Sequence, residues 1–160
     1  MSLLGKNNGF TLVEVIVVIV LMAIFATMAV SRQPHTDMTL RAGAEVLKTH
    51  LRYAQMRAMS TDNAWGISYN STSGAYWLFP QPQGTTRRIT LPGETQNSVD
   101  LVSSGVSSAE GTFTLIFDPR GRPDTTNSTL PFNARQATLT LSKSGESQTI
   151  TVMENTGFIQ

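Results

Sequence analysis

One long apolar stretch near the N-terminus constrains this chain more than any other feature. The stretch runs from Phe10 to Val30, and its only polar members are Thr11, Glu14 and Thr27. As a helix, its roughly 21 residues would extend about 31 Å, close to the roughly 30 Å thickness of a bilayer hydrocarbon core. The sequence therefore predicts a membrane-spanning helical segment, which we place at residues 10–33.

Glu14 is the anomalous residue of this stretch. A carboxylate inside a membrane segment is costly and usually has a functional partner. An ordinary signal anchor, with Glu14 reaching toward the membrane interface, is one interpretation. A cleaved secretory signal fits less well, because such a signal has a shorter apolar region that ends in a small-residue cleavage site.

The residues Gly9-Phe10-Thr11-Leu12-Val13-Glu14, followed by the apolar stretch, resemble the N-terminal signal of type IV pilins and type II secretion pseudopilins. The resemblance implies that a prepilin peptidase removes the leader 1–9 after Gly9 and methylates the new amine of Phe10. It implies an assembly role for Glu14. It also implies a single-pass protein of the bacterial inner membrane, with the N-terminus in the cytoplasm and the domain in the periplasm.

The charge of the chain argues against a dedicated nucleic-acid binder. The sequence holds 12 Lys and Arg against 11 Asp and Glu, and without Lys6, Arg32 and Glu14 the remaining part is balanced. A balanced domain lacks the broad positive field that nucleic acids attract. The chain has no cysteine, which excludes disulfides, thiolate metal sites and cysteine nucleophiles.

After the apolar stretch the pattern becomes that of an amphipathic helix. Pro34 is expected to kink or interrupt the chain there, because proline lacks an N–H and clashes with the preceding turn. The helix then continues to about residue 61, before Asp62-Asn63. Apolar residues spaced four and three apart predict one buried stripe: Leu40, Ala44, Leu47, Leu51, Ala54 and Ala58. We interpret a neighbouring charged stripe as a solvated face: Arg41, Glu45, Lys48 and Arg52.

Beyond the helix the pattern changes to the period of two that is typical of strands. The predicted strands are 64–69, 75–79, 87–91, 98–102, 112–117, 136–142 and 147–153. The first two and the last two form hairpins. One helix followed only by strands predicts an α+β domain at 34–160, in which the helix covers an antiparallel sheet.

Three segments resemble the GspH/FimT family of minor pseudopilins and pilins. They are 51–59 with Trp65-Gly66-Ile67-Ser68, then 116–123, and finally Asn155-Thr156-Gly157. The resemblance implies the pilin fold. Major pilins usually close a carboxy-terminal loop with a disulfide, which this chain cannot form.

No residue pattern predicts catalysis, a cofactor or a metal site. We expect His35 and His50 to be surface residues. Asp118 and Asp124 could hold calcium, but acids in a Gly/Pro-rich loop are more often turn formers. We interpret four aromatic residues of the first hairpin as sheet core: Trp65, Tyr76, Trp77 and Phe79.

The sequence thus predicts a structural protein rather than an enzyme: a minor pseudopilin of the type II secretion system, at or near the pseudopilus tip. The alternative is a minor pilin of a type IV pilus, with DNA uptake as a further option. The implied partners are other pilins or pseudopilins, the prepilin peptidase, the inner-membrane assembly platform and secreted substrates. DNA is disfavoured, because the tail 156–160 has no arginine to contact phosphates.

Overall fold

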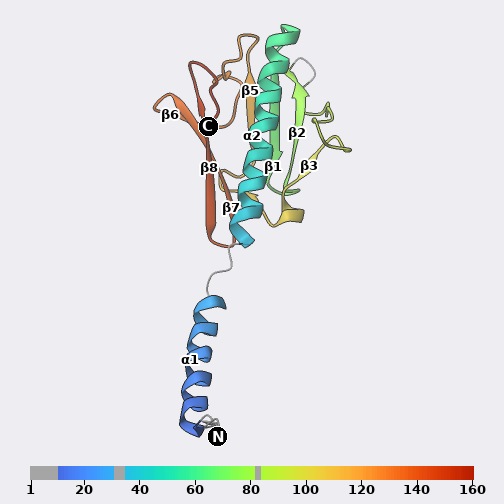
Figure 1. The fold of residues 1–160 in the computed structure, drawn as a ribbon. Coiled ribbons are helices and arrows are strands. Elements are labelled where there is room, and N and C mark those ends of the chain that lie inside the picture. The colour runs from blue at the N-terminus through green and yellow to red at the C-terminus, as the bar shows by residue number, and fades with distance from the viewer. Residues whose placement is uncertain (1–10, 31–34, 82–83) are drawn as a thin grey trace, which may run out of the picture. The chain divides into compact units, whose positions relative to one another are not determined.

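The computed structural model describes residues 11–30, 35–81 and 84–160. The chain divides after Pro34 into two compact units, which are described separately. The first carries the helix α1 (Leu12–Val30). The second carries the helix α2 (His35–Thr61) and all of the described strands (Figure 1). The predicted kink at Pro34 lies outside the described residues, as do Gly9 and Phe10.

Helix α2 packs against strands β1 (Trp65–Asn70), β5 (Phe113–Phe117), β7 (Gln136–Lys143) and β8 (Glu146–Met153) of the second unit. It contacts strands of both sheets (Figure 1). The predicted stripe is confirmed, since each of its six members is at most 1 % exposed: Leu40, Ala44, Leu47, Leu51, Ala54 and Ala58. After Thr61 the backbone of Asp62 adopts a left-handed conformation, with a φ of 51°, which does not continue an α-helix.

The strands form two four-stranded antiparallel sheets, whereas the sequence suggested one. The first sheet has the order β3-β2-β1-β5, with β2 (Ala75–Pro80) and β3 (Val99–Asp100). In the second sheet the central strand β7 pairs with β4 (Ser107–Ser108), β6 (Phe132–Asn133) and β8.

Both predicted hairpins are present. In the first, Asn70 pairs with Ala75, and β1 and β2 stay in register back to Trp65 and Pro80. In the second, Lys143 pairs with Glu146 across a two-residue loop. The loop residues Ser144 and Gly145 have φ values of 51° and 89°. Two positive φ values are the mark of a type I′ turn, whose twist matches that of the flanking strands.

The predicted strands 87–91 and 98–102 are wrong in extent. Both segments share the outer edge of β2, so each pairs with only part of it. Ile89 makes a single bridge to Leu78, while Val99 and Asp100 pair with Tyr76 and Ala75. Asp100 Oδ1 then accepts the backbone N–H groups of Val102, at 2.8 Å, and Ser103, at 3.2 Å, which starts a short 3₁₀ helix, η2 (Val102–Ser104).

The aromatic residues of the first hairpin lie in the core, as predicted, but on both faces of the sheet. Trp65 and Tyr76 belong to the main core, whereas Trp77 and Phe79 form a smaller cluster with Ile116. Gly66 packs closely against the smaller cluster: a Cβ added there would come within 2.8 Å of the Ile116 side chain and 2.9 Å of the Phe79 ring. The close packing of this sheet therefore depends on glycine at that position.

We predict that Leu47→Ala and Leu51→Ala each lower the free energy of unfolding by about 2–5 kcal/mol, because both side chains are fully buried. Val46→Ala is the matched control on the same helix, since Val46 is 43 % exposed. It should change the stability by less than about 0.5 kcal/mol. Urea unfolding followed by tryptophan fluorescence measures all three. Losses below about 1 kcal/mol at both leucines would contradict the core assignment.

Candidate assembly site

Glu14 lies in the first turn of α1, and a side chain caps the start of that helix. The Glu14 backbone N–H donates to Thr11 Oγ1 at 3.3 Å, and the Val15 N–H donates to the Thr11 carbonyl at 3.2 Å. A Thr followed three residues later by Glu is the sequence pattern of a capping box. The cap at Thr11 was not predicted from the sequence, although this pattern could have revealed it. At this position the carboxylate also gains from the positive end of the helix dipole.

The side chains of α1 around Glu14 are exposed. Glu14 lines a shallow groove with Val15, Val18 and Ile19. The large apolar side chains from Leu12 to Phe25 that lie on the surface are 48–76 % exposed. Soluble monomeric proteins rarely expose so continuous an apolar surface, and such surfaces mark contacts with proteins or membranes.

The predicted cleavage and methylation residues, Gly9 and Phe10, lie outside the described residues. Within the part of the chain that the structure describes, no helix is both long and apolar enough to cross a membrane. The membrane segment at 10–33 therefore stays a prediction.

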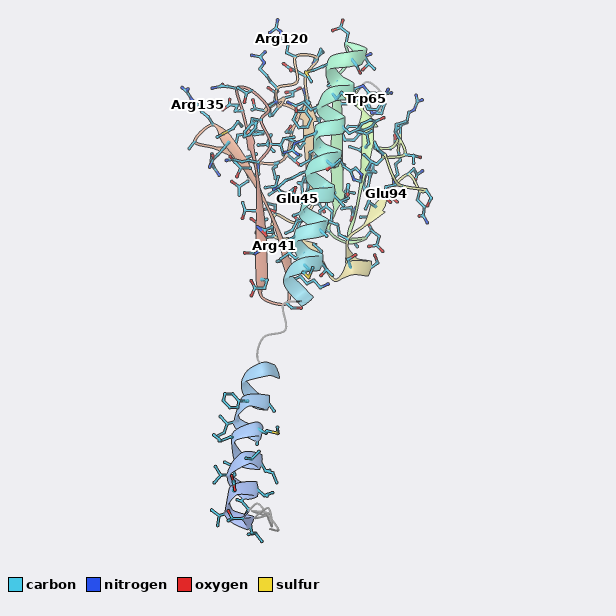
Figure 2. All side chains as sticks on the ribbon, in the orientation of Figure 1. Arg41, Glu45, Trp65, Glu94, Arg120 and Arg135 are labelled. Carbon is cyan, nitrogen blue, oxygen red and sulfur yellow. The ribbon has the colours of Figure 1, made fainter. Side chains whose placement is uncertain are left out.

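The charged stripe of α2 is only partly a solvated face. Figure 2 shows Arg41 and Glu45 carried by this helix. Lys48 Nζ donates to Glu45 Oε1 at 2.8 Å, and this hydrogen bond and the lysine's charge lower the pKa of Glu45. Arg52, however, donates through Nη2 to the carbonyl of Ile159 at 3.0 Å. It thereby ties the C-terminal segment to the helix.

The three segments that resemble the GspH/FimT family meet at one side chain, Gln55 of α2. Its Nε2 donates to the carbonyl of Gly121 at 2.7 Å and to the carbonyl of Gly157 at 3.1 Å. Both glycines have positive φ, of 77° and 67°. Gln55 thus joins the end of α2, the loop after β5 and the C-terminal turn, which are far apart in sequence.

His50 is buried at 2 % exposure, so the expected surface position is wrong. Its Nδ1 lies 2.7 Å from the Tyr76 hydroxyl, and its Nε2 lies 3.2 Å from the Pro92 carbonyl oxygen. A carbonyl only accepts, so Nε2 carries the hydrogen and Nδ1 accepts from the tyrosine. Burial and the nearby charge of Glu94 raise the pKa of Tyr76, which keeps the phenol protonated as the donor.

This His–Tyr pair joins α2 to β2 and to the loop at Pro92, and we assign it a structural role. Helical spacing could have revealed it, because His50 follows the buried Leu47 by three residues and directly precedes the buried Leu51.

Asp118 and Asp124 are turn formers, as predicted. Asp118 Oδ1 accepts the backbone N–H groups of Arg120, at 2.9 Å, and Arg122, at 2.8 Å. Asp124 Oδ1 accepts those of Thr126, at 3.0 Å, and Asn127, at 3.1 Å. Partial desolvation alone would raise the pKa of Asp124, but its hydrogen bonds with Asn127 and Thr126 lower it. Among the described residues, no cluster of His, Asp and Glu side chains could hold a metal ion.

Comparison with known families decides the assignment of the chain. The family model for the prokaryotic N-terminal methylation motif matches residues 4–30, and the model for the type II transport protein GspH matches residues 43–156. The chain belongs to the GspH family. This membership agrees with the resemblance to minor pseudopilins and pilins seen in the sequence.

Solved structures of a minor pilin share the GspH-family fold found here. A crystal structure of the type IV minor pilin FimU of Pseudomonas aeruginosa is 17 % identical to this chain, with a TM-score of 0.53, and the match covers 79 % of this chain and 91 % of FimU. A second crystal form is also 17 % identical, with a TM-score of 0.50, and covers 76 % and 90 %. No curated protein sequence matches the chain.

We predict that Gly157→Ala disrupts the junction at Gln55. A Cβ at this position would collide with the Gly121 carbonyl oxygen and with Gln55 Nε2. Gly93→Ala is the matched control, because Gly93 also has positive φ, of 83°, but a Cβ there would meet nothing within 4 Å. Backbone strain should cost about 1–2 kcal/mol in both variants, and overpacking a further 1–3 kcal/mol in Gly157→Ala alone. Chemical denaturation gives both values, and equal losses would refute a tight junction.

Proposed function

We propose that this protein is a minor pseudopilin of the type II secretion system, a structural subunit at or near the tip of the pseudopilus. The observation that carries the proposal is the start of α1. There a capped first turn presents Glu14 on a helix whose apolar side chains are exposed. The match to the N-terminal methylation motif over the same residues supports it. Other pseudopilins would cover this helix in the filament.

In this proposal the protein enters the inner membrane as a precursor. The prepilin peptidase cuts between Gly9 and Phe10 on the cytoplasmic side, and the new N-terminus is methylated. The remaining helix anchors the subunit, with the domain from 34 to 160 in the periplasm. The assembly platform then moves the subunit into the filament. The protein's role is structural and needs no cofactor.

Glu14 has a specific place in this proposal. After cleavage, the positive amine of Phe10 lies four residues from the Glu14 carboxylate in sequence. In an environment of low dielectric constant, an ion pair with the amine of a neighbouring subunit is strongly favourable, whereas an isolated carboxylate is penalised. Such a pair would set the axial register between adjacent subunits.

A minor pilin of a type IV pilus is the alternative function. A strain that lacks the gene for this protein separates the two functions, since loss of a secretion subunit lowers the amount of exported protein and loss of a pilus subunit lowers the number of surface pili. The neighbouring genes give an independent indication, because secretion genes with other pseudopilins would favour the first function and pilus-assembly genes the second.

We predict that Gly9→Val blocks processing by the prepilin peptidase, because the branched side chain is too large for a protease subsite that accepts glycine. Co-expression with the peptidase, followed by intact mass measurement, should show the unprocessed chain. The parent chain should lose residues 1–9 and gain one methyl group. Normal processing of the valine variant would contradict the proposed cleavage site. Gly9→Ala is the size-matched comparison and should still be processed.

We predict that Glu14→Leu and Glu14→Gln insert into the membrane normally but lower secretion or piliation at least about tenfold, because the loss of one partner of a buried ion pair costs about 2–5 kcal/mol. The readout is complementation of the deletion strain, with membrane levels of each variant measured by immunoblot. Val17→Leu, an apolar exchange on the same helix, is the control and should retain function. Full function of Glu14→Leu at normal abundance would show that the carboxylate does not determine assembly.

A further inference from the structure

A cleft of about 430 Å³ opens beside the C-terminal end of α2 and has no part in the proposed assembly function. Arg57 of α2 and Arg87 line it, and Trp65, Pro80 and Ile89 supply apolar walls. Figure 2 shows Trp65 beside this end of the helix. The cleft therefore combines two guanidinium groups with apolar surface.

Arg57 is held in a defined position within this cleft. Its guanidinium carbon lies 4.6 Å from the centroid of the Trp65 ring. The ring is fixed in turn, because Trp65 Nε1 donates to Thr61 Oγ1 at 2.7 Å. A guanidinium stacked on an aromatic face keeps its in-plane N–H donors available for other partners. Arg57 is thus preorganised to bind an acceptor.

One hydrogen-bond donor of the Arg57 guanidinium is buried without an acceptor in the part of the chain that the structure describes. Its Nε is buried and has no hydrogen-bond partner among the described residues. A buried donor left without a partner is costly, and native structures rarely keep one without a reason. An acceptor that enters the cleft and reaches this edge of the guanidinium would remove that cost.

The positive charge of the arginines that line the cleft favours the binding of an anion. Among the described residues, the lining of the cleft includes the cations Arg57 and Arg87 and no carboxylate. The nearest acid in the sequence, Asp62, is exposed and does not line the cleft. Planar guanidinium groups pair with carboxylates and phosphates through two parallel hydrogen bonds.

We propose that this cleft binds a carboxylate carried by a segment of a partner protein chain. The apolar walls fit the stem of an acidic side chain. An extended polyanion would need a continuous row of cations, and the sequence from residue 34 onward is balanced in charge. The proposal does not depend on the secretion or pilus function, so each can fail without the other.

The test is a titration of the full chain, labelled with nitrogen-15, in a non-ionic maltoside detergent. The probe is an acetylated, amidated alanine pentapeptide with one central glutamate, and its matched control carries glutamine instead. The reporter is the Arg57 Nε–H resonance, which burial protects from exchange with water and which is assigned by its loss in Arg57→Lys.

We expect the glutamate peptide, and not the glutamine peptide, to shift this resonance to saturation. Tryptophan fluorescence should follow the same titration in the variants. Arg57→Lys keeps the charge but loses the planar donor pair, and should weaken binding about tenfold or more. Arg87→Gln should weaken it as well. Arg120→Gln, in an exposed turn outside the cleft, should leave it unchanged.

Three results would overturn the proposal. The first is the absence of a saturable shift with the glutamate peptide in the folded parent chain. The second is equal binding of the glutamine peptide. The third is tighter binding of inorganic phosphate or of a single-stranded oligonucleotide, which would assign the cleft to phosphate groups instead.

Discussion

The buried stripe of α2 is the interaction on which the rest of the domain depends. Each sheet packs one face against this same helix. Burial of a leucine side chain contributes roughly 1.5–3 kcal/mol, and the alanines of the stripe let the strands approach closely. Every buried apolar residue among those described lies at or after Leu40, so α2, the strands and the loops between them build the core of the second unit.

Helix α1 contributes no buried apolar residue to this core among the described residues. Its large apolar side chains between Leu12 and Phe25 are exposed, and its one carboxylate stands in a capped first turn. Such a helix is unfavourable in water, so its surface needs cover from lipid or from other subunits. The model for the prokaryotic N-terminal methylation motif matches residues 4–30, which include this helix. In the proposed function, a membrane covers the helix before assembly and neighbouring helices cover it in the filament.

Much of the fold was predictable because it depends on local periodicity. The helical spacing from Leu40 to Ala58 identified the buried stripe, and the alternation from residue 136 to 153 identified the last hairpin. Periodicity does not say which strands pair, so the division into two sheets and the sharing of the β2 edge were missed. Gln55 was missed for a related reason, since its bonds to Gly121 and Gly157 span 66 and 102 residues of sequence.

We propose that the membrane covers the apolar surface of α1 before assembly. Alkaline carbonate extraction of membranes from cells that express the full chain tests it most directly. The parent chain should remain in the membrane pellet. A variant with Val18→Lys and Ile19→Lys should be released, because charges at the centre of the helix cost about 2.5–3.5 kcal/mol each. Release of the parent chain together with the variant would contradict the account.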